Sequence, residues 1–150
     1  MEIELRGTCP HWISEKEILQ AINFFLRYCG VERRNEEIII ELKPDNGFQF
    51  DTSHGTVASD TVGCFQDGVI TLFLKALEEG LGLSPRIETL LTVFHELDHW
   101  LWKAQGGSFN FDLPYFERPH EIRAFQNEWP LLEAFLGIHF GTLRGKGGAG

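Results

Sequence analysis

Cysteine is scarce in this chain, and no two cysteines lie near each other. The 150 residues include three, Cys9, Cys29 and Cys64, an odd number with no C-x-x-C pair. Such spacing excludes a disulfide framework and a zinc site built from thiolates. We therefore expect three reduced thiols in a cytoplasmic protein.

Long apolar runs and a signal-like start are also missing. The first six residues, MEIELR, lack the basic start and the apolar segment of a signal peptide. No stretch approaches the roughly 18 apolar residues that a membrane span requires. We expect no membrane partner.

Basic residues are outnumbered by acidic ones. The chain has 13 Lys and Arg against 22 Asp and Glu, a formal net charge of −9, and its longest basic cluster is Arg33-Arg34. Proteins that bind nucleic acid normally present a basic face. The charge therefore argues against a nucleic-acid partner, and no sequence feature predicts the oligomeric state.

Apolar residues are plentiful, at 43% of the chain with 13 Phe. A chain of this length can bury roughly 68–70% of its unfolded surface around one core. We see no repeat and no internal linker. We predict a single domain over residues 1–140 and a flexible glycine-rich tail over residues 141–150.

Local patterns in the first half of the chain predict an α+β fold. Residues 1–6 and 37–42 are typical of strands, and a turn at 44–47 predicts a hairpin between the second strand and residues 48–50. A second hairpin is predicted for residues 62–65 and 69–74 around Asp67-Gly68. A helix is expected over 14–29, because Ser14 and Glu17 form a capping box and Gly30 ends it.

Two helices are predicted in the second half. Ser84 as cap and Pro85 at the first helical position open a long helix that runs to about residue 104. Residues 108–118 are aromatic but interrupted by proline, and we expect a packed loop. A last helix begins at Pro119 and is kinked or restarted at Pro130 on its way to Leu136.

Residues 95–99, in the middle of the long helix, form an H-E-x-x-H motif. His95 and His99 lie on one helix face, where two imidazoles can converge on one cation. Glu96 projects in a neighbouring direction, from which a general base can reach a metal-activated water. Apolar residues surround the motif, so these polar groups are buried and need partners, which a metal ion provides. The alternative is a pair of hydrogen-bonded core histidines.

A catalytic zinc site takes three protein ligands and keeps a fourth position for water. The candidates for the third ligand are Asp112, Glu117, His120 and Glu121, with Glu128 and His139 further along the chain. We favour Glu121, because it opens a helix and is followed by Ala124, whose small side chain lets this helix pack closely against the motif helix. A helix-start carboxylate favoured by the helix dipole is the alternative.

His95-Glu96-Leu97-Asp98-His99, followed on the next helix by Glu121-Ile122-Arg123-Ala124, resembles the gluzincin branch of zinc metallopeptidases. The order of elements over residues 36–130 is similar to the minigluzincins and to the small SprT-like and ImmA-like peptidase domains. The resemblance implies a zincin-like fold, with a small mixed or antiparallel sheet packed against an N-terminal helix, a central H-E-x-x-H helix and a glutamate helix.

The resemblance also implies an activity, that of a zinc metallopeptidase acting on a peptide or protein. One Zn²⁺ per chain would be held by His95, His99 and Glu121, with Glu96 as general base and then as proton donor to the leaving amine. In such enzymes the substrate adds as a β-strand to a sheet-edge strand ahead of the motif helix. The matching place is occupied by Val69, Ile70, Thr71 and Leu72.

Some features depart from the gluzincin pattern. Trp100, directly after the second histidine, is bulky and is expected to narrow the cleft. Tyr115 and His120 are candidates for the oxyanion-stabilising residue, although neither matches the spacing found in larger gluzincins. Asp98 either orients a ligand imidazole or is an exposed or salt-bridged carboxylate.

A second function therefore stays open, a latent or non-catalytic metal-binding regulatory module with the same fold. A DNA-linked protease of the SprT-like type is disfavoured by the charge.

Overall fold

The structure is a computed structural model that describes residues 2–31, 36–45, 51–52, 55–56, 62–80 and 82–137, with backbone alone for 51–52 and 55–56. The first half contains β1 (Glu2–Arg6), α1 (Glu15–Tyr28), β2 (Glu37–Lys43), β3 (Asp51–Thr52), β4 (Gly55–Thr56), β5 (Gly63–Gln66) and β6 (Val69–Phe73). The second half contains α2 (Leu74–Glu79), α3 (Pro85–Ala104), a 3₁₀ turn (Tyr115–Glu117) and α4 (Pro119–Leu136). The α+β class is confirmed.

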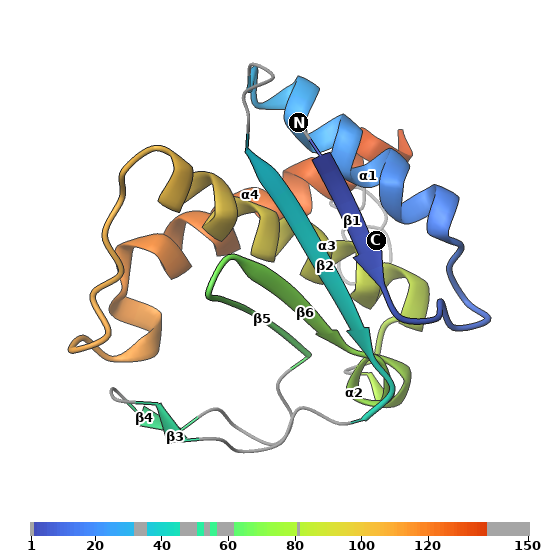
Figure 1. Ribbon diagram of the computed structural model, residues 1–150, viewed down its shortest axis with the longest axis horizontal. Helices are drawn as coiled ribbons and strands as arrows, with labels where there is room; N and C mark the ends of the chain where they lie inside the picture. The colour runs from blue at the N-terminus through green and yellow to red at the C-terminus, as the bar shows by residue number, and fades with distance from the viewer. Residues whose placement is uncertain are drawn as a thin grey trace, which may run out of the picture.

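Four strands form a mixed sheet in the order β1-β2-β6-β5 (Figure 1). β2 is parallel to both β1 and β6, whereas β5 is antiparallel to β6. The parallel pairing of β1 with β2 follows from α1, which lies between them in the chain and provides the crossover that parallel neighbours need. The short strands β3 and β4 pair only with each other.

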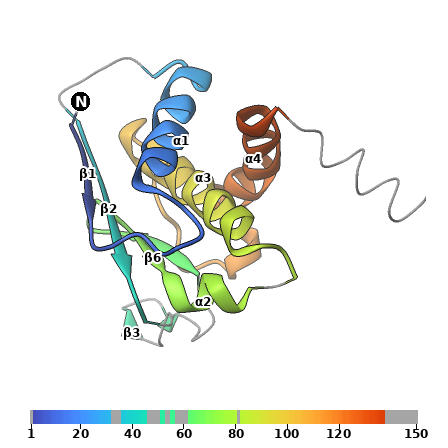
Figure 2. The same ribbon diagram turned by 90° about the vertical axis from the view of Figure 1, so that its right-hand side faces the viewer.

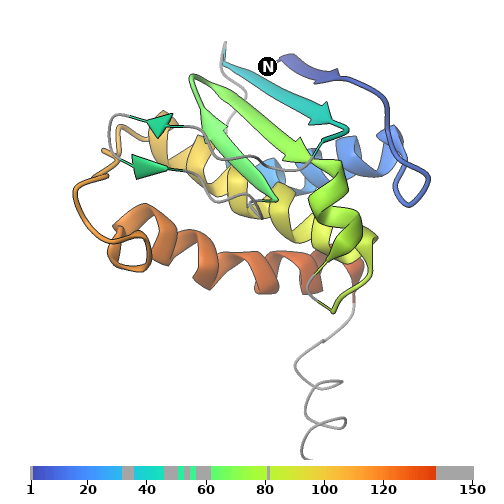
Figure 3. The same cartoon turned by 90° about the horizontal axis from the view of Figure 1, so that it is seen from below.

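The main helices pack on one face of the sheet in successive layers. α1 and α3 lie against the strands (Figure 2), and α4 lies on the far side of α3 (Figure 3). Alternate residues of β2 point into this core, where they meet the apolar side of α1. The residues that share this interior are Ile18, Ala21, Ile22, Phe25, Ile38, Ile40, Leu42, Ile70 and Leu72.

The capping signals predicted the helix ends correctly. The Ser14 hydroxyl accepts a hydrogen bond from the backbone N–H of Glu17, and the Ser84 hydroxyl does the same for Ile87. The second hairpin is also confirmed, because β5 and β6 are joined by Asp67 and Gly68 with φ of 53° and 79°. Positive φ at both central residues matches the right-handed strand twist.

Other expectations about local structure were wrong. β2 has β1 and β6 as its neighbours, so it is a central parallel strand, which explains its run of isoleucines, rather than half of a hairpin. Its predicted partner, residues 48–50, lies outside the described residues, as does the tail at 141–150. The strand predicted to reach Leu74 stops at Phe73, and α2 begins at Leu74. α4 continues through Pro130, so of the predicted kink or restart the restart is wrong.

None of the helices in the described part of the chain combines the length and apolarity needed to cross a bilayer. All three cysteines are unpaired thiols.

Candidate metal centre

The motif lies on the most deeply buried helix of the fold. Every residue of α3 from Glu88 to Leu101 is buried, because this helix has the sheet on one side and α4 on another. α4 runs antiparallel beside it (Figure 3). Ala124 of α4 is fully buried and follows Glu121 by three residues, so it lies on the same helix face as Glu121. A small side chain there permits the close approach that brings polar groups of both helices together.

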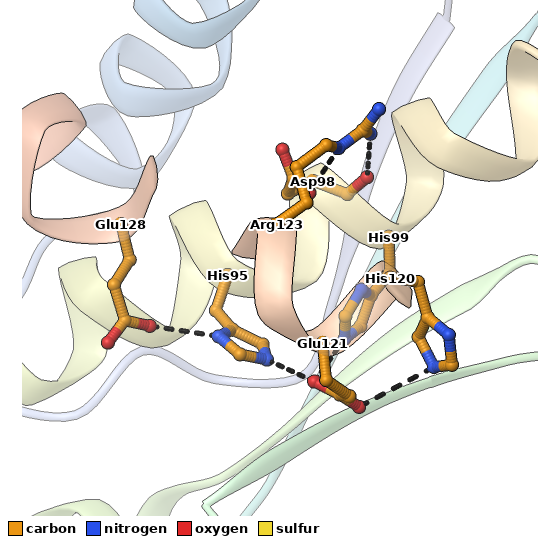
Figure 4. Close-up of polar contacts among 7 residues, drawn as sticks. All are labelled: His95, Asp98, His99, His120, Glu121, Arg123 and Glu128. Carbon is orange, nitrogen blue, oxygen red and sulfur yellow. Dashed lines mark hydrogen bonds and ion pairs between the residues drawn. The ribbon is translucent and has the colours of Figure 1, made fainter. Parts of the chain in front are cut away.

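His95, His99 and Glu121 meet at a single point. The Nε2 atoms of His95 and His99 lie 2.8 Å and 2.9 Å from the same oxygen, Oε1 of Glu121 (Figure 4). The two rings stand 4.8 Å apart at 81° to each other. All three side chains are buried. The structure therefore gathers the three residues that the sequence selected as ligands.

Glu96 lies beside the same imidazoles. One of its carboxylate oxygens and ring nitrogens of His95 and His99 all fall within 4.8 Å of one another. Glu96 is 5% exposed, and its Oε2 has no hydrogen-bond partner among the described residues. Burial raises the pKa of this carboxyl, although the two histidines oppose the shift. Of the two carboxylates, Glu121 contacts both Nε2 atoms, whereas Glu96 keeps a free oxygen.

The charges of the cluster suit a divalent cation. Burial alone would lower the pKa of His95, but hydrogen bonds to Glu121 and Glu128 raise it to about 10. Burial raises the pKa of Glu121, but hydrogen bonds with the two histidines hold it well below its usual range. His95 therefore carries a proton on each nitrogen and offsets part of the negative charge of Glu96, Glu121 and Glu128. A metal ion would offset that charge in place of the proton on Nε2.

The donor set fits zinc. Two imidazole nitrogens and one carboxylate oxygen are a common ligand set of catalytic zinc sites, in which neighbouring ligand atoms stand about 3.3 Å apart. The observed separations of 2.8 Å and 2.9 Å are hydrogen-bond distances, so these atoms would move apart by about half an ångström to admit a zinc ion. The same three donors also accept Mn²⁺, Co²⁺ and Ni²⁺, so they do not select one metal.

Glu128 has a role that the sequence reasoning missed. The sequence places Glu128 only among the more distant candidate ligands. In the structure its Oε2 lies 2.8 Å from Nδ1 of His95, the ring nitrogen that faces away from Glu121. A carboxylate in this position fixes the ring orientation and directs Nε2 towards a metal. The signal was its spacing, because Glu128 follows Glu121 by two helical turns and so lies on the same face of α4.

Asp98 forms the salt bridge that was one of its two predicted alternatives. Its carboxylate accepts from Nε of Arg123 at 2.9 Å, and its backbone carbonyl accepts from Arg123 at 3.0 Å (Figure 4). The carboxylate also accepts from the side-chain amide of Asn127 at 3.2 Å. These contacts join α3 to α4 and do not involve the imidazoles. Asp98 therefore fixes the position of one helix against the other.

Tyr115 and His120 both border the centre. Nε2 of His120 lies 3.7 Å from Oε2 of Glu121, and burial lowers the pKa of this histidine to about 4, so the ring is neutral at pH 7. Tyr115 is 43% exposed, and its hydroxyl lies near the carboxylate of Glu121. Burial and the negative charges of Glu121 and Glu96 raise the pKa of this phenol, which keeps its proton.

The predicted substrate strand is in the wrong place. Val69, Ile70, Thr71 and Leu72 belong to β6, which has β2 on one side and β5 on the other, so β6 is not a sheet edge. The edge on this side of the four-stranded sheet is β5, because the hairpin folds it outside β6. β5 passes close to α3 at Gly63, which has no side chain. A Cβ atom added there would lie only 2.5 Å from Cγ2 of Thr92, a residue of α3 one turn before Glu96.

The remaining candidates within the described part of the chain do not join the cluster. Trp100 does not narrow the cleft as expected, because it points to the sheet, where its indole N–H donates to the carbonyl of Glu37 at 3.0 Å. Asp112 and Glu117 are exposed in the loop before α4. His139 lies outside the described residues.

Comparison of the chain with protein-family models, with curated proteins and with solved structures gives no match.

Proposed function

We propose that this protein is a zinc metallopeptidase of the gluzincin type that hydrolyses peptide bonds at the α3–α4 centre. The observation that carries the proposal is the approach of Nε2 of His95 and Nε2 of His99 to one oxygen of Glu121, with an unpartnered oxygen of Glu96 beside them. A pair of hydrogen-bonded core histidines would not require Glu96 as a second buried carboxylate. A buried carboxylate oxygen without a hydrogen-bond partner destabilises the fold, so its presence needs another explanation.

Each residue of the centre has a role in this reaction. His95, His99 and Glu121 would hold the metal. When bound, a zinc ion supplies a Lewis acid that acidifies water and polarises the scissile carbonyl. Glu96 accepts a proton from the attacking water, whose oxygen bonds to the carbonyl carbon. Glu96 then delivers that proton to the amine nitrogen as the C–N bond breaks.

Tyr115 and His120 are suited to stabilise the developing negative charge on the substrate oxygen. Both lie within reach of Glu121, and both are uncharged, with the phenol as hydrogen-bond donor and the imidazole able to donate from one nitrogen. A donor aimed at an oxyanion is typically worth about 3–4 kcal/mol of barrier. Substrate would extend the sheet along the outer edge of β5, the strand beside α3.

The test uses Glu96→Gln, which keeps the size of the side chain and removes the base. The parent protein should cleave a mixture of unstructured peptides in the presence of zinc, and a chelator should abolish this cleavage. Glu96→Gln should bind zinc as the parent does and cut nothing. The matched control is Glu78→Gln on α2, where Glu78 is exposed, and it should behave as the parent. A Glu96→Gln variant as active as the parent would refute the proposal.

One observation favours the second function, a latent or non-catalytic metal-binding regulatory module. His120 brings a third imidazole to the centre, with its ring 5.1 Å from that of His99 and its Nε2 3.7 Å from Oε2 of Glu121. A fourth protein ligand would close the site, as in structural zinc sites. This function would be supported if the parent protein binds one zinc ion per chain and cuts no peptide, whereas the His120→Ala variant does cut peptides.

A further inference from the structure

Exposed apolar side chains are concentrated next to the metal centre. The described residues include eight large hydrophobic side chains with substantial exposure, and six of them fall within residues 111–125. We call these six the aromatic surface, and their exposed fractions range from 36% to 74%: Phe111, Leu113, Tyr115, Phe116, Ile122 and Phe125. Exposed apolar side chains gathered in one place mark a binding surface more often than singly scattered ones do.

The aromatic surface is continuous with the metal centre. The ring of Phe125 packs against the ring of His95, with centroids 4.7 Å apart. Phe116 and Tyr115 follow at 5.8 Å and 6.2 Å from Phe125. The Tyr115 hydroxyl also lies near the Glu121 carboxylate. A ligand on this surface would therefore lie beside the metal ligands.

The loop that carries part of this surface is held in place by Arg118. The guanidinium donates to the carbonyl of Leu113 at 2.9 Å and to that of Phe111 at 3.3 Å. It also lies 5.2 Å from the ring centroid of Phe111 and 5.8 Å from that of Tyr115. The apolar groups are therefore positioned before a ligand arrives, which lowers the entropic cost of binding.

We propose that the aromatic surface binds a large apolar side chain of an extended peptide, next to the bond that is cut. This inference rests on the proposed peptidase function and specifies its substrate class, unfolded or extended segments that contain Phe, Leu or similar residues. The contact between Phe125 and His95 favours a peptide over a lipid surface, since it joins the aromatic surface to the site of hydrolysis. The net charge of −9 also opposes an anionic membrane.

The test measures binding separately from cleavage. Zinc-loaded Glu96→Gln protein is titrated into two fluorescein-labelled peptides, KAAAFAAAK and KAAASAAAK, and anisotropy is recorded. We expect the phenylalanine peptide to bind at least about tenfold more tightly, since burying half of that ring is worth about 1.4 kcal/mol. Adding Phe116→Ser should reduce this preference to about threefold or less. The control is Tyr28→Ser on α1, which removes an exposed aromatic ring elsewhere and should leave the preference unchanged.

The outcomes separate this proposal from the peptidase function. Equal affinity for the two peptides, or no binding of either, overturns the proposal even if the parent protein cuts peptides. A clear preference in a parent protein that binds zinc but cuts nothing overturns the peptidase function and leaves the peptide-binding surface standing. If sedimentation shows a dimer that Phe116→Ser dissociates, with the peptide preference unchanged, the surface belongs to a second copy and the proposal fails.

Discussion

The contact between Glu128 and His95 allows the metal centre to be perturbed without changing a ligand. Oε2 of Glu128 lies 2.8 Å from Nδ1 of His95, and the two side chains are 15% and 9% exposed. Glu128→Ala removes the group that holds the imidazole in its orientation. Outer partners of this kind are worth about 10–100-fold in metal affinity, or about 1.4–2.8 kcal/mol. Because this contact is short and largely buried, we expect the upper half of that range.

The assay is competition for zinc between the protein and a chromophoric chelator at pH 7.5, with folding checked by circular dichroism. Glu128→Gln should lose less affinity than Glu128→Ala, because its amide oxygen still accepts the hydrogen bond from Nδ1. Glu78→Ala, an exposed position on α2, serves as the control and should bind zinc as the parent does. A folded Glu128→Ala protein with the zinc affinity of the parent would contradict the role assigned to this carboxylate.

Three other changes test the surroundings of the centre. Arg123→Ala leaves the buried Asp98 carboxylate with Asn127 as its remaining side-chain partner. It should lower the free energy of unfolding in urea by about 2 kcal/mol. This loss is smaller than for a fully buried ion pair, because the Arg123 side chain is 28% exposed. A loss too small to measure would show that the salt bridge is dispensable. Pro130→Ala restores an N–H inside α4 at an exposed position and should stabilise the protein by about 1–3 kcal/mol; destabilisation would contradict this. In excess chelator, the His95 pKa of about 10 exceeds the value of about 6.5 in unfolded chains. The stabilisation from protonated His95 is therefore complete below pH 6.5 and is lost as the pH rises through about 10. The Tm of the metal-free protein should fall over this interval. A Tm that rises instead would contradict the hydrogen bonds assigned to His95.

Signals that act within one segment predicted their structures well. The α3 helix begins after Ser84 as expected, because a cap and a first-turn proline act locally, and it ends at Ala104, near the predicted position. The grouping of His95 and His99 depends only on helical spacing. Glu121 was also selected correctly as the later acidic residue that lies next to His95 and His99, because its position at the start of α4 places it opposite the motif.

Relationships between segments could not be predicted in the same way. Which residues of α4 meet Asp98 depends on the rotation of α4 about its own axis, and the pattern of one helix does not determine it. For the same reason, the prediction that Trp100 points into the cleft was wrong. The sheet edge was misplaced because the sequence predicts that β5 and β6 form a hairpin but does not indicate which of them pairs with β2.

The central claim is that His95, His99 and Glu121 together bind one divalent ion. Calorimetric titration of the chelator-stripped protein with Zn²⁺ tests it most directly, with Glu121→Ala and the exposed-site control Glu117→Ala measured alongside the parent. We predict one zinc ion per chain for the parent and for Glu117→Ala, and no saturable high-affinity binding for Glu121→Ala. Equal stoichiometry and affinity in all three proteins would contradict the account.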